Sequence, residues 1–282
     1  MGSFSILNNI SGISAQNQLN LNSVNLSRTL MRLSSGKRIN TGADDAAGLQ
    51  VADSLRANVR ALDQAVRNAN DGVSVGQIAD GALAQMSELL TRAVTLAEEA
   101  ATNTTDSTGR TALDTEFTAI KDEIQRIADQ TNFNGTALFT TAGLNGSLKV
   151  FVGDLSGASS IAVTIATITS DTVGNQTGFD ATSLTSQDNA AAAITAIRDA
   201  INGVSSQRGD IGAGINRLQS AVAVLQTQSQ NTQAAESAVR DANVAQEVSK
   251  LVSYQILAQS GVAALAQANT NSQVVLNLMR NI

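Results

Sequence analysis

The chain contains no proline among its 282 residues, and this absence is the strongest constraint on its fold. Proline breaks helices from within, so nothing in this sequence forces a helix to end. Aromatic residues make up only 2%, whereas a thick globular core normally relies on Phe, Tyr and Trp. The composition therefore favours long helices packed in thin layers.

Composition also excludes several kinds of chemistry. Without Cys or His there is no disulfide, thiolate nucleophile, His general base or Cys/His zinc site. We therefore expect no enzyme of these classes and no cofactor; catalysis by carboxylates, Lys or Tyr stays open on composition alone. The net charge of −6 lacks the basic balance of a nucleic-acid binder.

The beginning of the chain, MGSFSILNNISGISAQ, lacks the basic region and unbroken apolar stretch of a secretory signal. The first charged side chain is Arg28. No segment is long and apolar enough to span a bilayer. We expect a soluble chain that makes no membrane contact, or one that is exported by another route.

Both ends carry heptad patterns. Leu19, Leu26 and Leu33 fall seven residues apart, with Leu30 four after Leu26. Near the other end, the apolar positions of the pattern are Val248, Leu251, Val262, Leu265, Leu276 and Met279, with Gln255, Ala258, Asn269 and Ser272 between them. Such helices are weak alone. They need partners, which are either other copies of the chain or each other in a hairpin.

The interior predicts long helices from Asp44 to about Ala101, over about 111–129, and from about Ser186 onward, with a turn near 208–214. Residues 136–187 instead read as a small β insert. Strands are predicted at 148–152 and 161–165, and Asn145-Gly146 is a type I′ hairpin signal.

Residues 33–48, LSSGKRINTGADDAAG, contain a Gly-Lys pair typical of phosphate-binding loops. That loop needs Gly five positions before Gly36, where Met31 stands, so the nucleotide-site interpretation fails. A joint between helices fits better. Gly36 would end one helix, Asp44 or Thr41 would cap the next, and Asp45 would lie in its first turn.

Three stretches carry a family resemblance. LSSGKRINTGADDAAGLQVADSLRANVRALDQAVRNANDGVSVGQIADGAL resembles the N-terminal region of bacterial flagellins. QTNFNGTALF resembles the segment before their β region, and AESAVRDANVAQEVSKLVSYQILAQSGVAALAQANTNSQVVLNLMRNI resembles their C-terminal region. Together these stretches cover about two fifths of the chain, toward both of its ends and in the family's order.

The resemblance implies a short flagellin without large outer domains. The expected fold is mainly α, with long antiparallel helices in a coiled-coil or bundle arrangement and a small β-hairpin insert. The implied division is 1–43 and 241–282 as the two halves of an inner-core helical domain, 44–135 and 188–240 as the shell helices, and 136–187 as the tip. In the family the inner helices are disordered in the monomer and pair in the filament.

The implied function is that of a structural subunit of the extracellular flagellar filament, exported by the flagellar type III apparatus without a cleaved signal peptide. The implied partners are copies of the chain, an export chaperone, the filament cap and the hook-junction proteins. The ten apolar heptad residues of the two ends would form the polymer interface. A toll-like receptor is a further implied partner, through Arg92, Leu96 and Glu116. The alternative is a hook–filament junction protein.

Overall fold

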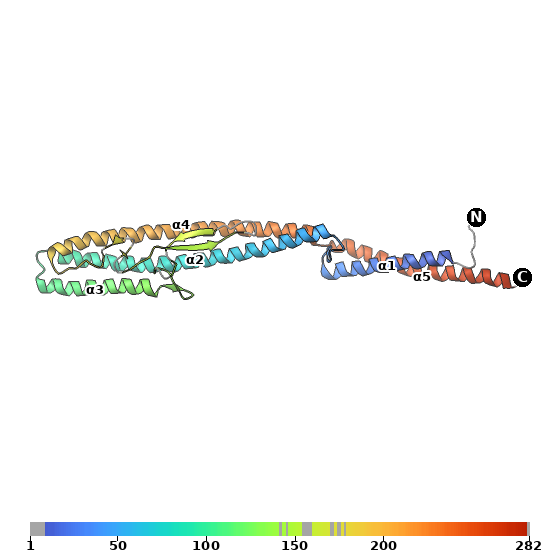
Figure 1. The fold of residues 1–282 in the computed structure, drawn as a ribbon, viewed down its shortest axis with the longest axis horizontal. Helices are drawn as coiled ribbons and strands as arrows, with labels where there is room; N and C mark the ends of the chain where they lie inside the picture. Colours follow the sequence, from blue (N-terminus) through green and yellow to red (C-terminus); the bar gives the residue numbers. More distant parts are fainter. Residues whose placement is uncertain are drawn as a thin grey trace. The chain divides into compact units, whose positions relative to one another are not determined.

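The computed structural model describes residues 9–140, 143–144, 146–153, 160–169, 172–173, 176–177 and 179–280, of which 172, 176, 177, 272 and 275–280 are described by their backbone alone. The helices are α1 (Ile10–Ser35), α2 (Ala46–Ala100), α3 (Ser107–Gln130), α4 (Gln187–Arg240) and α5 (Val244–Arg280) (Figure 1). The strands are β1 (Asn132–Phe133), β2 (Thr136–Ala137), β3 (Ser147–Phe151), β4 (Ser160–Thr164), β5 (Thr172–Val173) and β6 (Gln176–Thr177).

The predicted fold class is confirmed. Helix α2 has 55 residues and α4 has 54, and each is about 80 Å long at 1.5 Å per residue. The strands pair as antiparallel hairpins, β1 with β2, β3 with β4 and β5 with β6. The chain divides into two compact units, one formed by residues 1–56 and 232–282 and the other by residues 57–231.

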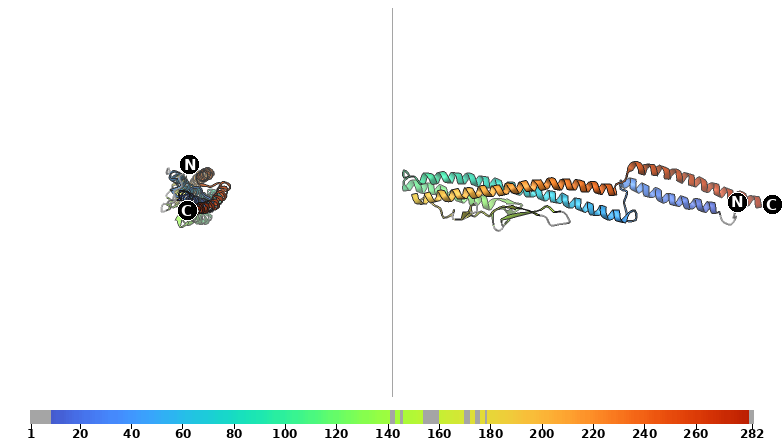
Figure 2. Two further views of the ribbon diagram at one scale, coloured as in Figure 1. Left: turned by 90° about the vertical axis from the view of Figure 1, so that its right-hand side faces the viewer. Right: turned by 90° about the horizontal axis from the view of Figure 1, so that it is seen from above.

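In the unit of residues 57–231, α2 and α4 run antiparallel. Three side-chain contacts join them in opposite order along the chain: Asp63 with Ser229 (2.8 Å), Asp80 with Arg208 (2.8 Å) and Glu98 with Arg198 (3.4 Å). Helix α3 folds back beside α2 (Figure 2). The apolar faces of the three helices meet in one core.

Large side chains fill this core from the helices and from the irregular segments between them. The largest fully buried ones in this unit are Leu62, Leu83, Met86, Leu90, Leu96, Phe117, Ile124, Phe139, Leu138, Ile165 and Ile168. On α3, Phe117, Ile120 and Ile124 are buried and Ile127 is partly buried. These four residues recur at steps of three and four, which is the spacing of one face of a helix.

The β3–β4 hairpin lies on α2 and α4 through glycines. A Cβ on Gly72 of α2 would lie 2.6 Å from Cγ2 of Val150, and one on Gly214 of α4 would lie 2.7 Å from Cγ1 of Val163. Both valines are buried. The two strands lie one residue before the predicted ranges, with Ser147 paired to Thr164.

The predicted turn near 208–214 is wrong, because α4 continues through this segment without a break. Glycine disfavours a helix interior by about 1 kcal/mol relative to alanine. Here tertiary packing overrides that preference: Ile211 is fully buried, Arg208 pairs with Asp80, and Gly214 admits Val163. The glycine at 214 serves close packing instead of a turn.

The turn signal at Asn145-Gly146 lies partly outside the described residues, because Asn145 is not among them. Around it the N–H of Ser147 donates to the carbonyl of Leu144 (3.2 Å), and Gly146 has φ +83° and precedes β3, whose partner is β4. A type I′ turn needs positive φ at both central residues. Asn134 (φ +50°) and Gly135 (φ +79°) have this geometry and join β1 to β2. The same Asn-Gly signal was present there in the sequence.

Candidate functional site

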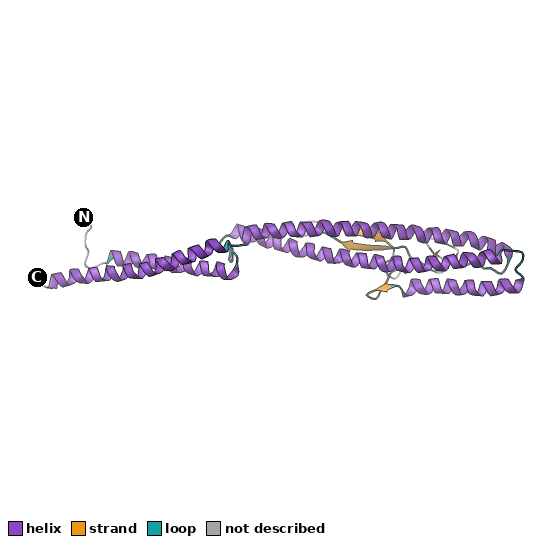
Figure 3. Ribbon diagram, turned by 180° about the vertical axis from the view of Figure 1, so that it is seen from behind, coloured by secondary structure: helices purple, strands orange, loops and turns teal. Residues whose placement is uncertain are grey.

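Helices α1 and α5, which carry the two ends of the chain, pack side by side (Figures 1 and 3). The Asn22 side chain donates to the carbonyl of Tyr254 (2.8 Å), and the Asn9 side chain donates to that of Ala268 (3.2 Å). The partner number rises as the α1 number falls, so the helices are antiparallel. Asn9 also caps α1 by accepting from the N–H of Gly12 (2.9 Å).

The face of α1 that is turned toward α5 follows a heptad pattern. Its buried and half-buried positions are Gly12, Ala15, Leu19, Asn22, Leu26, Thr29 and Leu33. The predicted leucines at 19, 26 and 33 therefore share this face. The fourth, Leu30, is 47% exposed and points elsewhere.

The facing side of α5 consists of Glu247, Leu251, Tyr254, Ala258, Gly261, Leu265 and Ala268, which are buried or half-buried. Leu251 and Leu265 are thus on the seam as predicted. Val248 and Val262, which the sequence pattern placed beside them, are 41% and 56% exposed. The side chains of Leu276 and Met279 lie outside the described residues.

The seam on α5 is therefore turned by one heptad position from the predicted one. Beside the heptad position of Leu251, Ala258 and Leu265, the side of α5 that faces α1 has a second heptad position. It is occupied by Glu247, Tyr254, Gly261 and Ala268, and not by Val248 and Val262 as the pattern predicted. A pattern of apolar residues does not include these small and polar positions. What identifies them is their seven-residue spacing, which matches the seven-residue spacing of the small and polar residues Ala15, Asn22 and Thr29 on α1.

Because the seam on α5 does not include all the apolar residues of the heptad pattern, apolar side chains are exposed on the outside of the pair. Most of the large apolar side chains that are exposed among the described residues lie on these two helices: Ile10, Ile13, Leu21, Val24, Leu30 and Met31 on α1, and Val244, Val248, Val252, Ile256, Leu257, Val262 and Val274 on α5. A monomeric protein seldom exposes so many apolar residues together, and such patches mark interaction sites.

A short backbone bridge holds the joint between these helices and the long ones. Gly36 ends α1 in the left-handed conformation (φ +69°), as predicted. The N–H of Arg38 then donates to the carbonyl of Arg240 (2.7 Å), and the N–H of Ala242 donates to that of Gly36 (2.9 Å). The two linkers therefore pair with each other.

Charged side chains surround this bridge. The guanidinium of Arg240, only 11% exposed, lies 3.2 Å from Asp53. That of Arg38 donates to the carbonyl of Val239 (2.8 Å), and Arg32 lies 3.6 Å from Asp44. These three arginines thus contact the protein's own carbonyls and carboxylates, which agrees with a structural joint.

The adjacent carboxylates Asp44 and Asp45 have different roles. Asp45 accepts from the N–H of Gly48 (2.9 Å), so it caps α2, and the expectation that Asp44 or Thr41 would do so is wrong by one residue. Asp44 accepts from the N–H and hydroxyl of Thr41 and from the N–H of Asn40. These hydrogen bonds, Thr41 first, and the charge of Arg32 lower the pKa of Asp44 below 3.8.

The residues of the implied receptor contact lie on α2 and α3. Arg92 donates twice to one carboxylate oxygen of Glu116 (2.9 and 2.7 Å), and the two side chains are 57% and 46% exposed. Leu96 is 1% exposed and belongs to the core. The structure brings the charged pair together on the surface, whereas the leucine is buried in the core.

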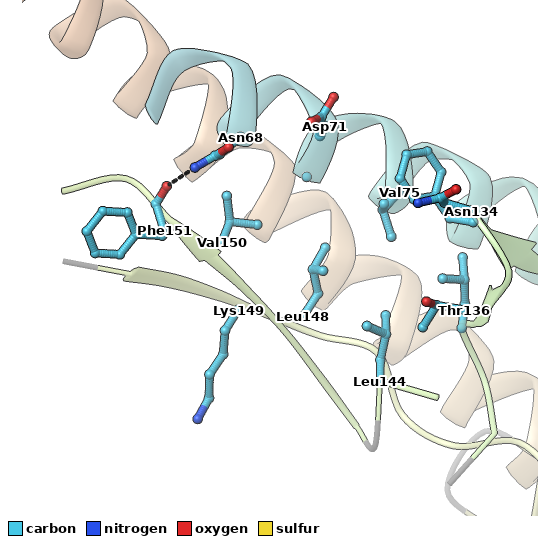
Figure 4. A pocket seen from close by; sticks show the side chains of 13 residues that line it. Asn68, Asp71, Val75, Asn134, Thr136, Leu144, Leu148, Lys149, Val150 and Phe151 are labelled. Carbon is cyan, nitrogen blue, oxygen red and sulfur yellow. Dashed lines mark hydrogen bonds between the residues drawn. The ribbon is translucent and has the colours of Figure 1, made fainter. Parts of the chain in front are cut away.

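A groove of about 440 Å³ lies beside β3, lined by α2, the β1–β2 hairpin and Leu144. Asn68 closes one end by donating to the carbonyl of Phe151 (3.2 Å), as Figure 4 shows. The groove has one carboxylate, Asp71 on α2, and one amine, Lys149 on β3, among its lining residues. Lys149 points away from α2. The groove therefore has apolar walls without a paired acid and base.

In the described part of the chain, no group of three or more His, Cys, Asp or Glu side chains is placed to hold a metal ion. None of the helices in that part combines the length and the hydropathy needed to cross a bilayer.

Comparison with known proteins agrees with this architecture. The family model of the bacterial flagellin N-terminal helical region matches residues 6–143, and that of the C-terminal helical region matches residues 194–279. A flagellin of Halalkalibacterium halodurans is 37% identical over 98% of this chain and 99% of its own length. Flagellin FlaB1 of Treponema pallidum is 35% identical with the same coverage.

A solved structure of a flagellar hook-associated protein from Vibrio parahaemolyticus has a TM-score of 0.56 at 18% identity, covering 70% of this chain and 99% of that chain, which is a likeness of fold. The two family models together match most of this chain, and the two flagellin relatives align with it over nearly their whole length. The chain therefore belongs to the bacterial flagellin family, as a short form without large outer domains.

Proposed function

We propose that this protein polymerises with copies of itself into a helical flagellar filament, and that the α1–α5 pair forms the contact inside the polymer. Flagellins are structural proteins and not enzymes. The adjacent carboxylates of the joint agree with this, because Asp45 caps α2 and Asp44 holds the preceding loop by hydrogen bonds. A contact between unlike surfaces that does not close propagates into a helical assembly.

The observation that carries the proposal is the set of apolar side chains on the outside of the pair. Leu21 is 60% exposed on α1, and Ile256 is 56% exposed on α5. Burying them against neighbouring copies contributes about 25 cal/mol per Å² of apolar surface. That gain offsets the cost of ordering the ends, about 1–2 kcal/mol per residue for the backbone.

The test compares two exposed apolar residues. Ile256→Asn alters the outer face of α5, and Val224→Asn, at a residue 64% exposed on α4, is the control. We expect Val224→Asn to elongate filament seeds as the parent does and Ile256→Asn to elongate them at least about tenfold more slowly. Light scattering and electron microscopy measure elongation. Equal elongation by Ile256→Asn would count against the proposal.

Export through the flagellar type III apparatus, with an export chaperone, a filament cap and hook-junction proteins as partners, belongs to the same proposal. A hook–filament junction protein is the competing function. It would form a short ring, whereas a filament subunit forms long polymers unaided. The identity of 35–37% to flagellins over almost the whole chain favours the filament subunit.

Recognition by a toll-like receptor is a second candidate function, favoured by the exposed Arg92–Glu116 pair. Arg92→Ala and Glu116→Ala would each reduce receptor signalling by the monomer. Arg126→Ala is the matched control, because Arg126 forms another exposed pair with Glu123. Unchanged signalling by both test variants would reject this contact.

A further inference from the structure

The hydrogen bonds of the β3–β4 hairpin show which backbone groups of β3 point away from β4. The N–H of Ile165 donates to the carbonyl of Gly146 (3.3 Å), one pair beyond the register of the two strands. In an antiparallel ladder such hydrogen-bonded pairs alternate with pairs whose N–H and C=O groups point outward. Along β3, Lys149 and Phe151 therefore occupy outward positions. Their N–H and C=O groups lie on the edge of the hairpin that β4 does not cover.

This outer edge of β3 faces the groove beside α2. At one end of the edge, Asn68 of α2 donates to the carbonyl of Phe151 (3.2 Å), as Figure 4 shows. At the other end, the N–H of Ser147 donates to the carbonyl of Leu144 (3.2 Å). Between these ends, the N–H and C=O of Lys149 have no hydrogen-bond partner among the described residues. An unpaired strand edge is a template for another strand.

The groove also suits the side chains of an added strand. Its volume of about 440 Å³ lies within the range of ligand pockets. Its walls include Val75, Leu138 and Leu148, and Phe151 is 48% exposed beside them. An extended peptide places alternate side chains on the same face. One face of such a peptide would therefore cover these apolar walls.

One charge of the groove favours a particular kind of peptide. Asp71 of α2 is an exposed carboxylate among the lining residues, and it has no ion pair or hydrogen bond within the described part of the chain. The amine of Lys149 points away from α2. Electrostatic complementarity then favours a peptide that carries Lys or Arg beside its apolar residues.

We propose that the outer edge of β3 binds an extended, basic peptide segment of another protein as a third strand. The backbone of the segment hydrogen-bonds to Lys149, its alternate apolar side chains fill the groove, and a basic side chain pairs with Asp71. The residues of this contact all belong to the unit of residues 57–231. The site is therefore separate from the α1–α5 pair and does not rest on the filament function.

Two proline variants of the full-length chain test the edge. Proline lacks the N–H, so Lys149→Pro removes the outward donor of β3 and leaves the hydrogen bonds with β4 in place. The matched control is Ala162→Pro, because Ala162 lies opposite Lys149 on β4 and its N–H points to the other edge of the hairpin. Lys149→Met controls for the loss of the side chain.

The probe is a fluorescent peptide of alternating valine and lysine with five residues, the length of β3. We expect Ala162→Pro and Lys149→Met to bind it as the parent does, and Lys149→Pro to bind it at least about tenfold more weakly. Fluorescence anisotropy measures the binding. Equal binding by the two proline variants would overturn the proposal, and so would the absence of saturable binding to the parent below about 1 mM.

Two further measurements do not depend on how the proline variants fold. The peptide should slow hydrogen exchange at the amide of Lys149 in the parent and leave that of Ala162 unchanged. Asp71→Asn should weaken binding about twofold to fivefold, and a peptide of alternating valine and glutamate should bind the parent more weakly than the lysine peptide. Unchanged exchange at Lys149, or equal binding of the two peptides, would count against the proposal.

A second copy of the chain is the competing occupant of this edge. In that case Lys149→Pro would lower the light scattering of dissociated chains, Ala162→Pro would not, and the lysine peptide would fail to compete. That result would overturn the assignment of the edge to a segment of another protein. We expect instead that both variants scatter light as the parent does.

Discussion

Gly72 of α2 lies so close to Val150 of β3 that an added β-carbon would stand 2.6 Å from Cγ2 of the valine and 3.1 Å from Cδ1 of Leu218. At Gly81, on the same helix, an added β-carbon would have no atom within 4 Å other than those of the helix's own neighbouring backbone. One glycine admits a strand, and the other only weakens the helix.

The two glycines should therefore respond in opposite ways to alanine. We expect Gly72→Ala to lower the free energy of unfolding by about 1–3 kcal/mol through overpacking. Gly81→Ala should raise it by about 0.5–1 kcal/mol, because alanine favours the helix. Denaturant unfolding followed by circular dichroism measures both. Equal stability of the two variants would show that β3 does not rest on Gly72 in solution.

Acid should weaken the joint at Asp44. The lowered pKa means that the folded chain binds this proton less readily than the unfolded chain, whose Asp has a pKa of 3.8. The carboxylate thus stabilises the fold above pH 3.8, and this contribution is lost as the pH falls through the lower folded pKa. Asp44→Asn should be less stable than the parent at pH 7, and the difference in the free energy of unfolding should decrease as the pH falls below 3.8.

Thermal unfolding of the parent and of Asp44→Asn at pH 7 and at pH 3 measures this effect. Asn at position 44 does not titrate, so the variant is its own reference across the pH range. A stability difference that is the same at both pH values would contradict the assignment of the hydrogen bonds to the ionised carboxylate.

Lys121 should hold the segment that leads into α4. Its ammonium donates to the carbonyls of Asp180 (3.0 Å) and Thr182 (2.9 Å) and lies 5.2 Å from the centre of the Phe117 ring. Lys121→Met keeps the aliphatic stem but removes the donors, so we expect a loss of about 1–2 kcal/mol. Hydrogen exchange around residues 179–184 should become faster.

The control for this prediction is Lys149→Met, since Lys149 is exposed and points away from α2 (Figure 4). It should leave exchange at residues 179–184 unchanged. Similar exchange in the two variants would mean that the ammonium of Lys121 contributes little to the order of this segment.

The chain ends should gain order on assembly. The seam between α1 and α5 is thin and partly polar, and many apolar residues of the pair stay exposed. We expect the amides of both helices to exchange rapidly in the dissociated chain and slowly in filaments, while those of α2–α4 are protected in both. Strong protection of α1 and α5 in dilute monomer would indicate a stable hairpin that needs no neighbours.

Much of the fold follows from local patterns. The spacing of apolar residues predicts the long helices and the buried face of α3, because burial on one side of a helix requires that period. Gly36 predicts the end of α1, because glycine adopts the left-handed conformation at little cost. At the joint, however, the pattern could not separate Asp44 from Asp45 as the cap, since both are good caps and the choice depends on the loop's own hydrogen bonds.

The amino-acid sequence by itself determined the helical architecture, the position of the β insert and the leucine column of α1, since these depend on neighbours along the chain. The tertiary structure decided which side of α5 faces α1, that α4 runs unbroken past Gly209 and Gly214, and that Leu96 is covered. Those outcomes depend on which distant segment packs against each face. A glycine that ends a helix and one that admits a strand look the same until the strand is in place.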